Sequence, residues 1–485
     1  MISDRTFRDL DLEDVFRFID RTLSRPGQQY LYYLLRCIPA TSERAARLEN
    51  RIDTLQESPS LRATVSKELS KLHERDAYYI SSLFQGEHIQ KPKWLWAIQL
   101  LAALAVISVI LSFFVPKISV LLIILFPINM GIHYWNKSNV YQYSSSIPQL
   151  LIMHKAARRI LASDAFQEYG DVSASITSLA KILPQMLIFK IEARLQSEIG
   201  QLVDYLFELI KALFLLEPIV LFSSLQKLET RKEEIGTIFR FIGETDAALS
   251  ILAMRESVPY FCNITHDPSG KGLIAQSVYH PLLFNGVSND ILLKGRSALL
   301  TGSNMSGKTT FIRTVGISAI LGQTLNTCFA KEFAMPFMRV ESSIRIADDL
   351  LDEKSYYMEE VLVLKELIGK SDNGKPALIL LDEIFKGTNS IERIAISKSV
   401  LNYLHDNGNL VFVSTHDREL TELLSENYEL YHFTEIIDGD QIAFDYKIKP
   451  GVLNTTNAIR ILAINNFPPQ IIQEANALSL KLRQM

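Results

Sequence analysis

The sequence is poor in cysteine and has no excess of basic charge, and both shortages narrow what the protein can be. Its 485 residues include three cysteines, Cys37, Cys262 and Cys328, which lie far apart and lack CxxC spacing. We therefore expect reduced thiols in a cytosolic compartment, with neither a disulfide framework nor a zinc site. The net charge of −4 at pH 7 argues against coating of nucleic acid through overall charge. The charged N-terminus also lacks the apolar core of a secretory signal peptide.

One region, in contrast, has almost no charge. From Trp94 to Phe114 the sequence is apolar and uncharged, and after Lys117 a second apolar run continues to Trp135. Each run is close to the ~20 residues that cross a hydrocarbon core of ~30 Å. Tryptophan at the outer ends is typical of membrane interfaces. These features predict a transmembrane helical hairpin over residues 94–135 with both flanks in the cytoplasm. The alternative is a buried helical hairpin in a soluble core.

A later apolar stretch, Leu202–Leu225, does carry charge. Asp204, Glu208, Lys211 and Glu217 recur in it at spacings of three to six. Charges at this spacing form a polar stripe along a helix. The stretch therefore predicts a core helix and not a third membrane span.

Short β-type runs begin only after about residue 260. Before that point, residues 10–85 and 146–260 have apolar positions at helical spacing. After it, runs bounded by Gly, Asn or Asp alternate with helical segments, and they are Ser297–Thr301, Ala377–Leu381 and Leu410–Ser414. This alternation is the βαβ pattern of a mostly parallel sheet.

These patterns predict an α/β domain preceded by an all-α region. We place the helical domain at residues 1–90 and 139–260, and the transmembrane hairpin at residues 91–138 interrupts it. The α/β domain covers residues 261–485.

The α/β region contains a phosphate-binding motif. The run GSNMSGKTT fits the pattern G-x-x-x-x-G-K-[ST], and it follows an apolar strand and precedes an apolar helix, as the motif requires. Lys308 is expected to reach the β and γ phosphates, and Thr309 to offer its hydroxyl to Mg²⁺. A chance match in a loop is the alternative, and the flanking elements argue against it. The predicted nucleotide-binding residues are Gly302, Ser303, Asn304, Met305, Ser306, Gly307, Lys308, Thr309 and Thr310.

Two later strand ends carry the groups that ATP hydrolysis needs. The apolar run Leu378–Leu381 ends in Asp382, a candidate Mg²⁺ ligand, and Glu383, a candidate base for the attacking water. His416 follows the next strand, where it can contact the γ-phosphate. Without the phosphate-binding motif, the two acids would be better interpreted as a solvated pair and His416 as a surface residue. Together the motifs predict an ATPase with ATP and Mg²⁺ as cofactors.

The motifs resemble those of the MutS family of ABC-type ATPases, known for DNA mismatch recognition. The family runs TGPNMGGKST, DEIGRGTS and ATHY are similar to TGSNMSGKTT, to DEIFKGTN at Asp382–Asn389 and to STHD at Ser414–Asp417. The segment Ser355–Glu360 resembles the family signature S-x-F-x-x-E. Further similarities are His280–Pro281 to the family's HP, Asn289 to the asparagine before its first strand, Ala347–Leu350 to its DDL segment, and Tyr446–Pro468 to its closing elements.

The resemblance implies how the protein assembles. In the family the signature completes the nucleotide site of the opposite subunit, which implies a homodimer with two composite ATP sites and Ser355 acting in trans. The helical part is similar to the family's core, or lever, domain at Phe18–Ile38, Leu48–Leu61 and Glu244–Ala253. For adenine stacking, Phe284 is nearby, but Gly286 or Val287 holds the family's aromatic position.

The departures from the family concern DNA. The sequence shows no counterpart of the mismatch-reading and connector domains, and Phe166–Glu168 has the letters F-x-E in the wrong region, so we interpret it as structural. The predicted membrane hairpin stands where the family inserts its DNA clamp. We expect a membrane-tethered, ATP-dependent DNA-binding protein of the MutS type, with its ATPase domain in the cytoplasm and helical levers that move on hydrolysis. The alternative is a membrane-associated mechanochemical ATPase that acts on a protein or lipid partner.

Overall fold

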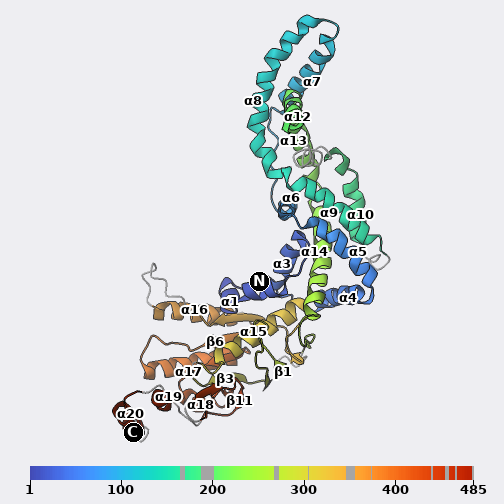
Figure 1. Cartoon of the computed structure of the whole chain (residues 1–485). Helices are drawn as coiled ribbons and strands as arrows, with labels where there is room; N and C mark the ends of the chain where they lie inside the picture. Colours follow the sequence, from blue (N-terminus) through green and yellow to red (C-terminus); the bar gives the residue numbers. More distant parts are fainter. Residues whose placement is uncertain are drawn as a thin grey trace. The chain divides into compact units, whose positions relative to one another are not determined.

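The protein consists of two compact units. The computed structural model describes residues 1–163, 170–186, 201–266, 272–303, 305–345, 356–372, 374–438, 441–453, 458–464 and 467–482 (Figure 1). One unit, here called the sheet unit, contains Met1–Ile19, Leu34–Leu48 and Met254–Met485. The other, the helical unit, contains Asp20–Tyr33 and Glu49–Ala253.

A six-stranded sheet forms the centre of the sheet unit, with strand order β11-β8-β3-β7-β6-β5. Neighbouring strands are parallel except for β11 and β8. Two smaller antiparallel sheets, β2-β1-β4 and β10-β9, accompany it. The strands are β1 (Gly272–Val278), β2 (Asn289–Lys294), β3 (Ser297–Thr301), β4 (Glu332–Ala334), β5 (Arg339–Ser343), β6 (Ala377–Asp382), β7 (Leu410–Ser414), β8 (Tyr428–His432), β9 (Glu435–Asp438), β10 (Gln441–Phe444) and β11 (Lys449–Pro450).

This sheet confirms the predicted α/β class and its mostly parallel order. The three apolar runs predicted as strands coincide with β3, β6 and β7. All five residues of β3 and of β7 are buried, which explains why both read as continuous apolar runs without alternation.

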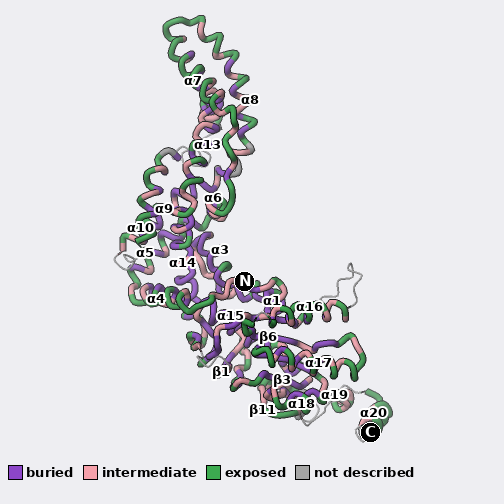
Figure 2. The backbone as a smooth tube through the Cα atoms, turned by 180° about the vertical axis from the view of Figure 1, so that it is seen from behind, coloured by how far each residue is buried: buried purple, intermediate pink, exposed green. Residues whose placement is uncertain are grey.

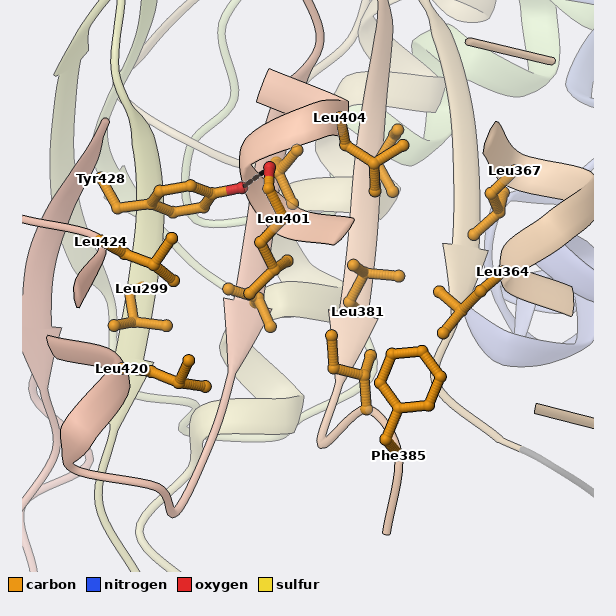
Figure 3. Close-up of a cluster of buried hydrophobic side chains, with 14 of the residues drawn as sticks. Leu299, Leu364, Leu367, Leu381, Phe385, Leu401, Leu404, Leu420, Leu424 and Tyr428 are labelled. Carbon is orange, nitrogen blue, oxygen red and sulfur yellow. Dashed lines mark hydrogen bonds between the residues drawn. The ribbon is translucent and has the colours of Figure 1, made fainter. Parts of the chain in front are cut away.

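Helices pack against this sheet and build its core. They are α15 (Lys308–Leu325), α16 (Tyr356–Ser371), α17 (Ser390–Asp406) and α18 (Glu419–Leu423). The C-terminal helices α19 (Ala458–Ile464) and α20 (Pro469–Leu482) pack against each other. Figure 3 shows the buried cluster in which Leu364 of α16, Leu381 of β6 and Leu401 of α17 meet. In the same cluster the buried Tyr428 hydroxyl donates to the Leu401 carbonyl at 2.8 Å (Figure 3). The phenol is thus buried with its polar atom paired.

Two N-terminal helices, α1 (Asp4–Asp9) and α2 (Leu12–Ile19), belong to the sheet unit. Asp9 is 1% exposed, and its carboxylate accepts hydrogen bonds from the Ser342 hydroxyl at 2.6 Å and from the backbone N–H of Ile344 at 3.0 Å. A buried carboxylate needs such donors. Asp9 therefore fixes α1 to the end of β5, although residues 1–19 were assigned to the helical region by pattern alone.

The helical unit is built from helices of 4 to 26 residues. Those described in it or at its boundaries are α3 (Arg25–Arg36), α4 (Glu43–Glu57), α5 (Pro59–Leu69), α6 (Ser82–Gln85), α7 (Leu95–Ser112), α8 (Ser119–Ser144), α9 (Ser146–Leu161), α10 (Gly170–Ala180), α12 (Gln201–Leu213), α13 (Leu216–Glu229) and α14 (Lys232–Arg255), with short 3₁₀ turns at Ser70–Leu72, Arg75–Ser81, Pro116–Ile118 and Leu183–Met186. The predicted all-α region is confirmed in this respect.

Close backbone approach explains one glycine of this unit. A Cβ on Gly27, in the first turn of α3, would lie 2.0 Å from Asp246 Oδ2. The Asp246 carboxylate, on α14, accepts hydrogen bonds from the backbone N–H of Leu23 at 3.0 Å and of Ser24 at 2.7 Å. Burial raises the pKa of Asp246 to about 6, against the lowering effect of these hydrogen bonds. The Ser24–Gly27 break is therefore the point where α3 begins against α14.

Helices α7 and α8 form an antiparallel hairpin whose surface is largely exposed (Figures 1 and 2). Two stretches are long and apolar enough to cross a membrane, Leu95–Ser112 and Pro116–Lys137, and in an apolar 18-residue segment of each, 22% and 17% of the residues are buried. These shares exclude, within this chain, the alternative of a hairpin buried in a soluble core. Membrane crossing itself stays a prediction.

The stretch predicted as one core helix is broken in two, so that prediction was wrong in this detail. Leu215 separates α12 from α13 with a φ of 51°, a left-handed conformation that ends a helix. Of its charged residues, Glu208, Lys211 and Glu217 form ion pairs inside the protein. Lys211, 1% exposed, donates to Glu208 Oε1 and Glu217 Oε1 at 2.6 Å each, and the ring nitrogens of His133 lie 3.3 and 3.4 Å from the second oxygens of the same carboxylates. The result is a buried ion network between α8, α12 and α13.

Candidate nucleotide-binding site

The loop between β3 and α15 has the backbone of a phosphate-binding loop. Gly302 and Gly307 have φ values of 141° and 106°, which L side chains rarely adopt. A Cβ on Gly302 would also lie 2.5 Å from the Phe433 carbonyl oxygen. The glycines of the motif are thus required by conformation at both positions and by space at the first. After Gly307 the chain enters α15, whose N-terminal N–H groups face the loop.

Lys308, the first residue of α15, folds back onto the loop. Its ammonium donates to the carbonyl oxygens of Gly302 at 2.7 Å and Ser303 at 2.9 Å, and the side chain is 2% exposed. Burial lowers the pKa of Lys308, with the carboxylates of Glu383 and Asp382 acting in the opposite direction. The cation therefore lies where an incoming phosphate would need it.

The remaining loop residues differ in their surroundings. The Ser306 hydroxyl donates to the Ser303 carbonyl at 2.7 Å, and the Ser303 hydroxyl donates to Glu435 at 3.3 Å. Met305 is exposed. Asn304 lies outside the described residues.

Thr309 and Asp382 meet as the sequence predicts. The Thr309 hydroxyl donates to Asp382 Oδ2 at 2.8 Å. The Ser414 hydroxyl donates to the other carboxylate oxygen, because Asp382 and Ser414 are paired in the parallel register of β6 and β7. A hydroxyl and a carboxylate are the hard oxygen ligands that suit Mg²⁺, so these residues fit that ion. Ser414 was not among the predicted site residues, although its place at a strand end was visible in the sequence.

Glu383 lies between Lys386 and His416. Its carboxylate is 2.7 Å from His416 Nε2 and 2.6 Å from Lys386 Nζ. Burial raises the pKa of Glu383, but the hydrogen bonds from His416 and Lys386 outweigh it and lower the pKa to about 2. The structure thus brings the predicted base and the predicted histidine together. Lys386 was missed, since a lysine three residues after an acid in a loop carries no motif.

A buried glutamate fixes the turn that follows β6. Glu383 and Phe385 have φ values of 49° and 60°, in the left-handed region that non-glycine residues seldom occupy. Glu360 of α16 is 1% exposed, and one of its carboxylate oxygens accepts the Phe385 backbone N–H. Burial raises the pKa of Glu360. Glu360 therefore joins α16, here called the signature helix, to the turn at Glu383–Phe385, here called the catalytic turn. Ser355, which precedes α16, lies outside the described residues, as do Ala347–Leu350.

A cavity of about 410 Å³ lies beside the phosphate loop. Its lining includes Gly307, Phe433 and Tyr446, and it also reaches Phe284 and Val287. Phe284 is 96% exposed.

Tyr446 is an aromatic residue of this cavity that sequence analysis did not propose for adenine stacking. It has a φ of 51°, and a Cβ on Gly307 would lie 3.3 Å from its ring. The Asn289 side chain donates to the Tyr446 carbonyl at 3.0 Å and accepts the Ile448 backbone N–H at 2.9 Å. Asn289, the first residue of β2, thus holds the loop that carries this ring. No spacing in the sequence links positions 289 and 446, which explains the omission.

Residues 298–483 match the family model described as MutS domain V. The curated protein "DNA mismatch repair protein MutS" of Natronomonas pharaonis is 27% identical over 263 residues, which are 52% of this chain and 30% of the relative. The protein of the same name from Geobacillus sp. (strain WCH70) is 30% identical over 264 residues, again 52% and 30%. That of Listeria monocytogenes serotype 4a (strain HCC23) is 34% identical over 198 residues, 39% and 23%. The chain thus spans less than a third of the length of these relatives.

Proposed function

This chain belongs to the MutS family by its domain V, and on that premise we propose that it binds ATP with Mg²⁺ and hydrolyses the ATP. The observation that carries the proposal is the meeting of three elements at one edge of the sheet. The phosphate loop after β3, Asp382 at the end of β6 and His416 after β7 contribute to the same site, and Thr309 contacts Asp382 directly. Parallel α/β sheets bind ligands at this carboxyl edge.

The chain's own groups divide the work. The N–H groups of the loop and of the α15 N-terminus bind the phosphates, and Lys308 exchanges its bonds to the Gly302 and Ser303 carbonyls for phosphate oxygens. Thr309 and Asp382 would hold Mg²⁺, which neutralises charge between the β and γ phosphates when bound.

Glu383 orients the attacking water and accepts its proton, while His416 contacts the γ-phosphate. Glu383 is ionised at neutral pH because its pKa is about 2. Its contacts with Lys386 and His416 have to rearrange before it can act as a base, since a carboxylate whose pKa is lowered by two such partners is a weak base. We propose that ATP binding causes this rearrangement.

We further propose that adenine occupies the cavity beside the loop. An aromatic ring at its wall, Tyr446, offers a stacking surface, and the cavity borders Gly307 of the phosphate loop. Its volume of about 410 Å³ is in the range of small-molecule sites.

A homodimer with two composite sites follows from the same premise. Ser355 stands directly before α16, and α16 is attached to the catalytic turn by Glu360. In the proposed dimer the partner subunit's Ser355 caps the γ-phosphate. ATP hydrolysis then opens the dimer, and the helices of the helical unit move with it as levers.

We propose that the movement acts on DNA, which the protein binds in the manner of mismatch repair proteins while it is tethered to a membrane. The support is that the relatives named above are DNA mismatch repair proteins. The membrane part rests on the two exposed apolar helices α7 and α8. A cytoplasmic position of the sheet unit would follow from such a hairpin.

The test is ATP turnover by the detergent-solubilised full chain, measured alone, with homoduplex DNA and with mismatched duplex, and with Glu383→Ala as the blank. Turnover that differs between the two duplexes supports a mismatch sensor. Turnover that ignores all DNA removes the DNA part and leaves the ATPase. Absence of turnover above the blank in every condition refutes the ATPase proposal itself.

The exposed hairpin favours a second candidate, a membrane-associated mechanochemical ATPase that acts on a protein or lipid partner. Large apolar side chains such as Leu100, Ile107 and Ile123 are 51% to 71% exposed on α7 and α8. Lipid is the solvent that suits such a surface. Reconstitution into liposomes that changes turnover while DNA does not would select this candidate.

A further inference from the structure

Cys262 and Cys328 face each other across an isolated antiparallel bridge in the sheet unit. The Cys262 N–H donates to the Cys328 carbonyl at 3.0 Å, and the Cys328 N–H donates to the Cys262 carbonyl at 2.8 Å. Residues that exchange both bonds in this way have Cα atoms about 5.5 Å apart. That separation is in the range of disulfides, about 4.4–6.8 Å. The backbone therefore needs no large movement to join the two sulfur atoms.

Packing against α15 fixes the buried member of the pair. Cys328 has no exposed surface, and its thiol donates to the Ser318 carbonyl at 3.5 Å. A Cβ on Gly322 of α15 would lie 2.6 Å from Cys328 Sγ and 2.9 Å from Ile264 Cδ1. The absence of a side chain at position 322 thus lets both cysteine-bearing segments lie against the same helix face.

Arg255 contacts both segments that carry the two cysteines. It is the last residue of α14, and its guanidinium donates to the Asn326 carbonyl at 2.9 Å and to the Thr327 hydroxyl at 3.1 Å, directly before Cys328. The same guanidinium carbon lies 4.8 Å from the centre of the Phe261 ring, and Phe261 directly precedes Cys262 in the chain. The two segments are therefore already aligned by non-covalent contacts.

The two thiols differ in reactivity. A hydrogen bond from Cys328 lowers the pKa of Cys262, which is half-buried and so open to small reagents. Burial raises the pKa of Cys328. The thiolate is the attacking species in disulfide exchange. This asymmetry gives Cys262 the attacking role and Cys328 the resolving role.

We propose that Cys262 and Cys328 are a reversible disulfide site, oxidised by a low-molecular-weight disulfide such as oxidised glutathione. The Cys262 thiolate attacks one sulfur of glutathione disulfide, forms a mixed disulfide and displaces one glutathione thiolate. Cys328 then gives up its proton, attacks Cys262 Sγ and displaces the second glutathione. Two protein thiols are oxidised, one glutathione disulfide is reduced to two thiols, and the protons go to the released thiolates.

The bond adds a covalent tie at the C-terminal end of α15. It closes a long chain loop that contains β1, β2, β3 and the phosphate loop. Such a cross-link restricts the unfolded chain and stabilises the folded one. The site goes beyond nucleotide hydrolysis and does not depend on it. The wide separation of the two cysteines in sequence, which suggested isolated thiols, concealed the pair.

The test uses the full chain in detergent, incubated with oxidised or reduced glutathione and examined by mass spectrometry without reduction. We expect a mass loss of about 2 Da, a cross-linked peptide that joins positions 262 and 328, and one alkylatable thiol, at Cys37. The midpoint of thermal unfolding should rise by about 4 °C or more and return after dithiothreitol.

Matched variants decide between the outcomes. Cys37→Ser should keep the cross-link, and Cys262→Ser should leave Cys328 reduced under the same oxidant. Cys328→Ala, checked for folding by circular dichroism, should stop at the mixed disulfide of Cys262 with glutathione. Three alkylatable thiols in the oxidised wild type, a wild type that stops at the mixed disulfide, or a cross-link through Cys37 would each overturn the proposal.

Discussion

The nucleotide site and the α7–α8 hairpin differ in whether their side chains find partners within the chain. In the site, groups from distant elements pair within the chain: Asp382 accepts from Thr309 and Ser414, and Glu383 accepts from His416. In the hairpin, Phe113 and Phe114 at the tip are 83% and 79% exposed. Burial of apolar surface is favourable by about 25 cal/mol per Å². The comparison shows that these described polar groups of the site are paired within the chain, whereas the described hairpin leaves large apolar side chains exposed.

The largest expected effect comes from charge placed on the hairpin. Ile107 and Ile123 are 51% and 71% exposed on α7 and α8. A lysine near the centre of a spanning helix costs about 2.5–3.5 kcal/mol on insertion. Ile107→Lys combined with Ile123→Lys should move the protein from the membrane fraction to the soluble fraction, while ATP turnover in detergent is retained.

The matched control is the double alanine variant at the same positions, which should stay with the membrane. Fractionation by ultracentrifugation and immunoblotting measures both. If the wild type remained in solution without detergent and all three proteins fractionated alike, the hairpin would not be a membrane element, and the contrast between the two regions would disappear.

The second-largest effect is expected from removal of Glu383, the proposed general base. Glu383→Ala should lower kcat by about 10²–10⁴-fold, the usual contribution of a positioned general base, because the variant lacks the carboxylate to which we assign deprotonation of the water. ATP binding, followed with a fluorescent analogue, should be retained. Lys386→Ala, which removes one cation from Glu383, serves as the control and should keep turnover. Equal losses of binding and turnover in Glu383→Ala would contradict the role of base.

The two units should also differ in their response to pH. For Asp246 in the helical unit, the folded carboxyl holds its proton up to about pH 6, while the unfolded one releases it near the ordinary value of 3.8. The folded state binds the extra proton between these values, so stability falls by about 3 kcal/mol as pH rises through this window. For Glu383, with its pKa of about 2 against 4.5, stability is present above pH 4.5 and is lost as pH falls toward 2.

Asp246→Asn should remove the first of these dependences. The measurement is thermal unfolding of the full chain between pH 4 and 6.5, with the exposed Asp53→Asn on α4 as the control. The wild type and the control should lose stability of the helical unit across this range more steeply than Asp246→Asn. Parallel curves for all three proteins would show that Asp246 does not hold a proton in the folded chain.

The smallest effect is expected at the link between the signature helix and the catalytic turn. Glu360→Ala leaves the Phe385 N–H without its acceptor, which costs about 1–3 kcal/mol, and it should lower kcat about 10-fold with little change in KM. Glu360→Gln keeps an acceptor oxygen and should stay close to the wild type. Glu359→Ala, on the same helix turn, is the control. A fall in kcat of Glu360→Ala that matches a loss of folded protein, followed by circular dichroism at the assay temperature, would indicate a general loss of folding and not a role in positioning Glu383.

Sequence reasoning reached those parts of the site whose residues are neighbours in the chain or stand at strand ends. The run Gly302–Thr310 and the pair Asp382 and Glu383 identify themselves by spacing, and the register of β6 beside β7 then brings His416 to them. Lys386 escaped notice, and Glu360 and Tyr446 were named only as ends of the segments Ser355–Glu360 and Tyr446–Pro468, without a role in the site. All three reach the site through a loop or a helix face and not at a strand end.

The fold was predictable where the period of the apolar residues is clear, as in β3, β6 and β7. It was not predictable at Leu215, where a residue without turn character adopts a left-handed conformation and separates α12 from α13. Nor could the sequence place α1 with the sheet unit, because the reason is the tertiary contact of Asp9 with the end of β5. Tertiary contacts decide such positions against local pattern.

Helix α15 has almost no solvent face: apart from Thr309, Thr310 and Arg313, its residues are buried from Lys308 to Leu325. At 1.5 Å per residue it is about 27 Å long. A helix enclosed on all sides cannot curve toward water and has little room to shift sideways in a close-packed interior. In mechanical terms it is a stiff strut. We therefore expect a displacement at its phosphate end to move the helix along its axis or together with the sheet, and so to reach the opposite end, beside Cys328 and Arg255.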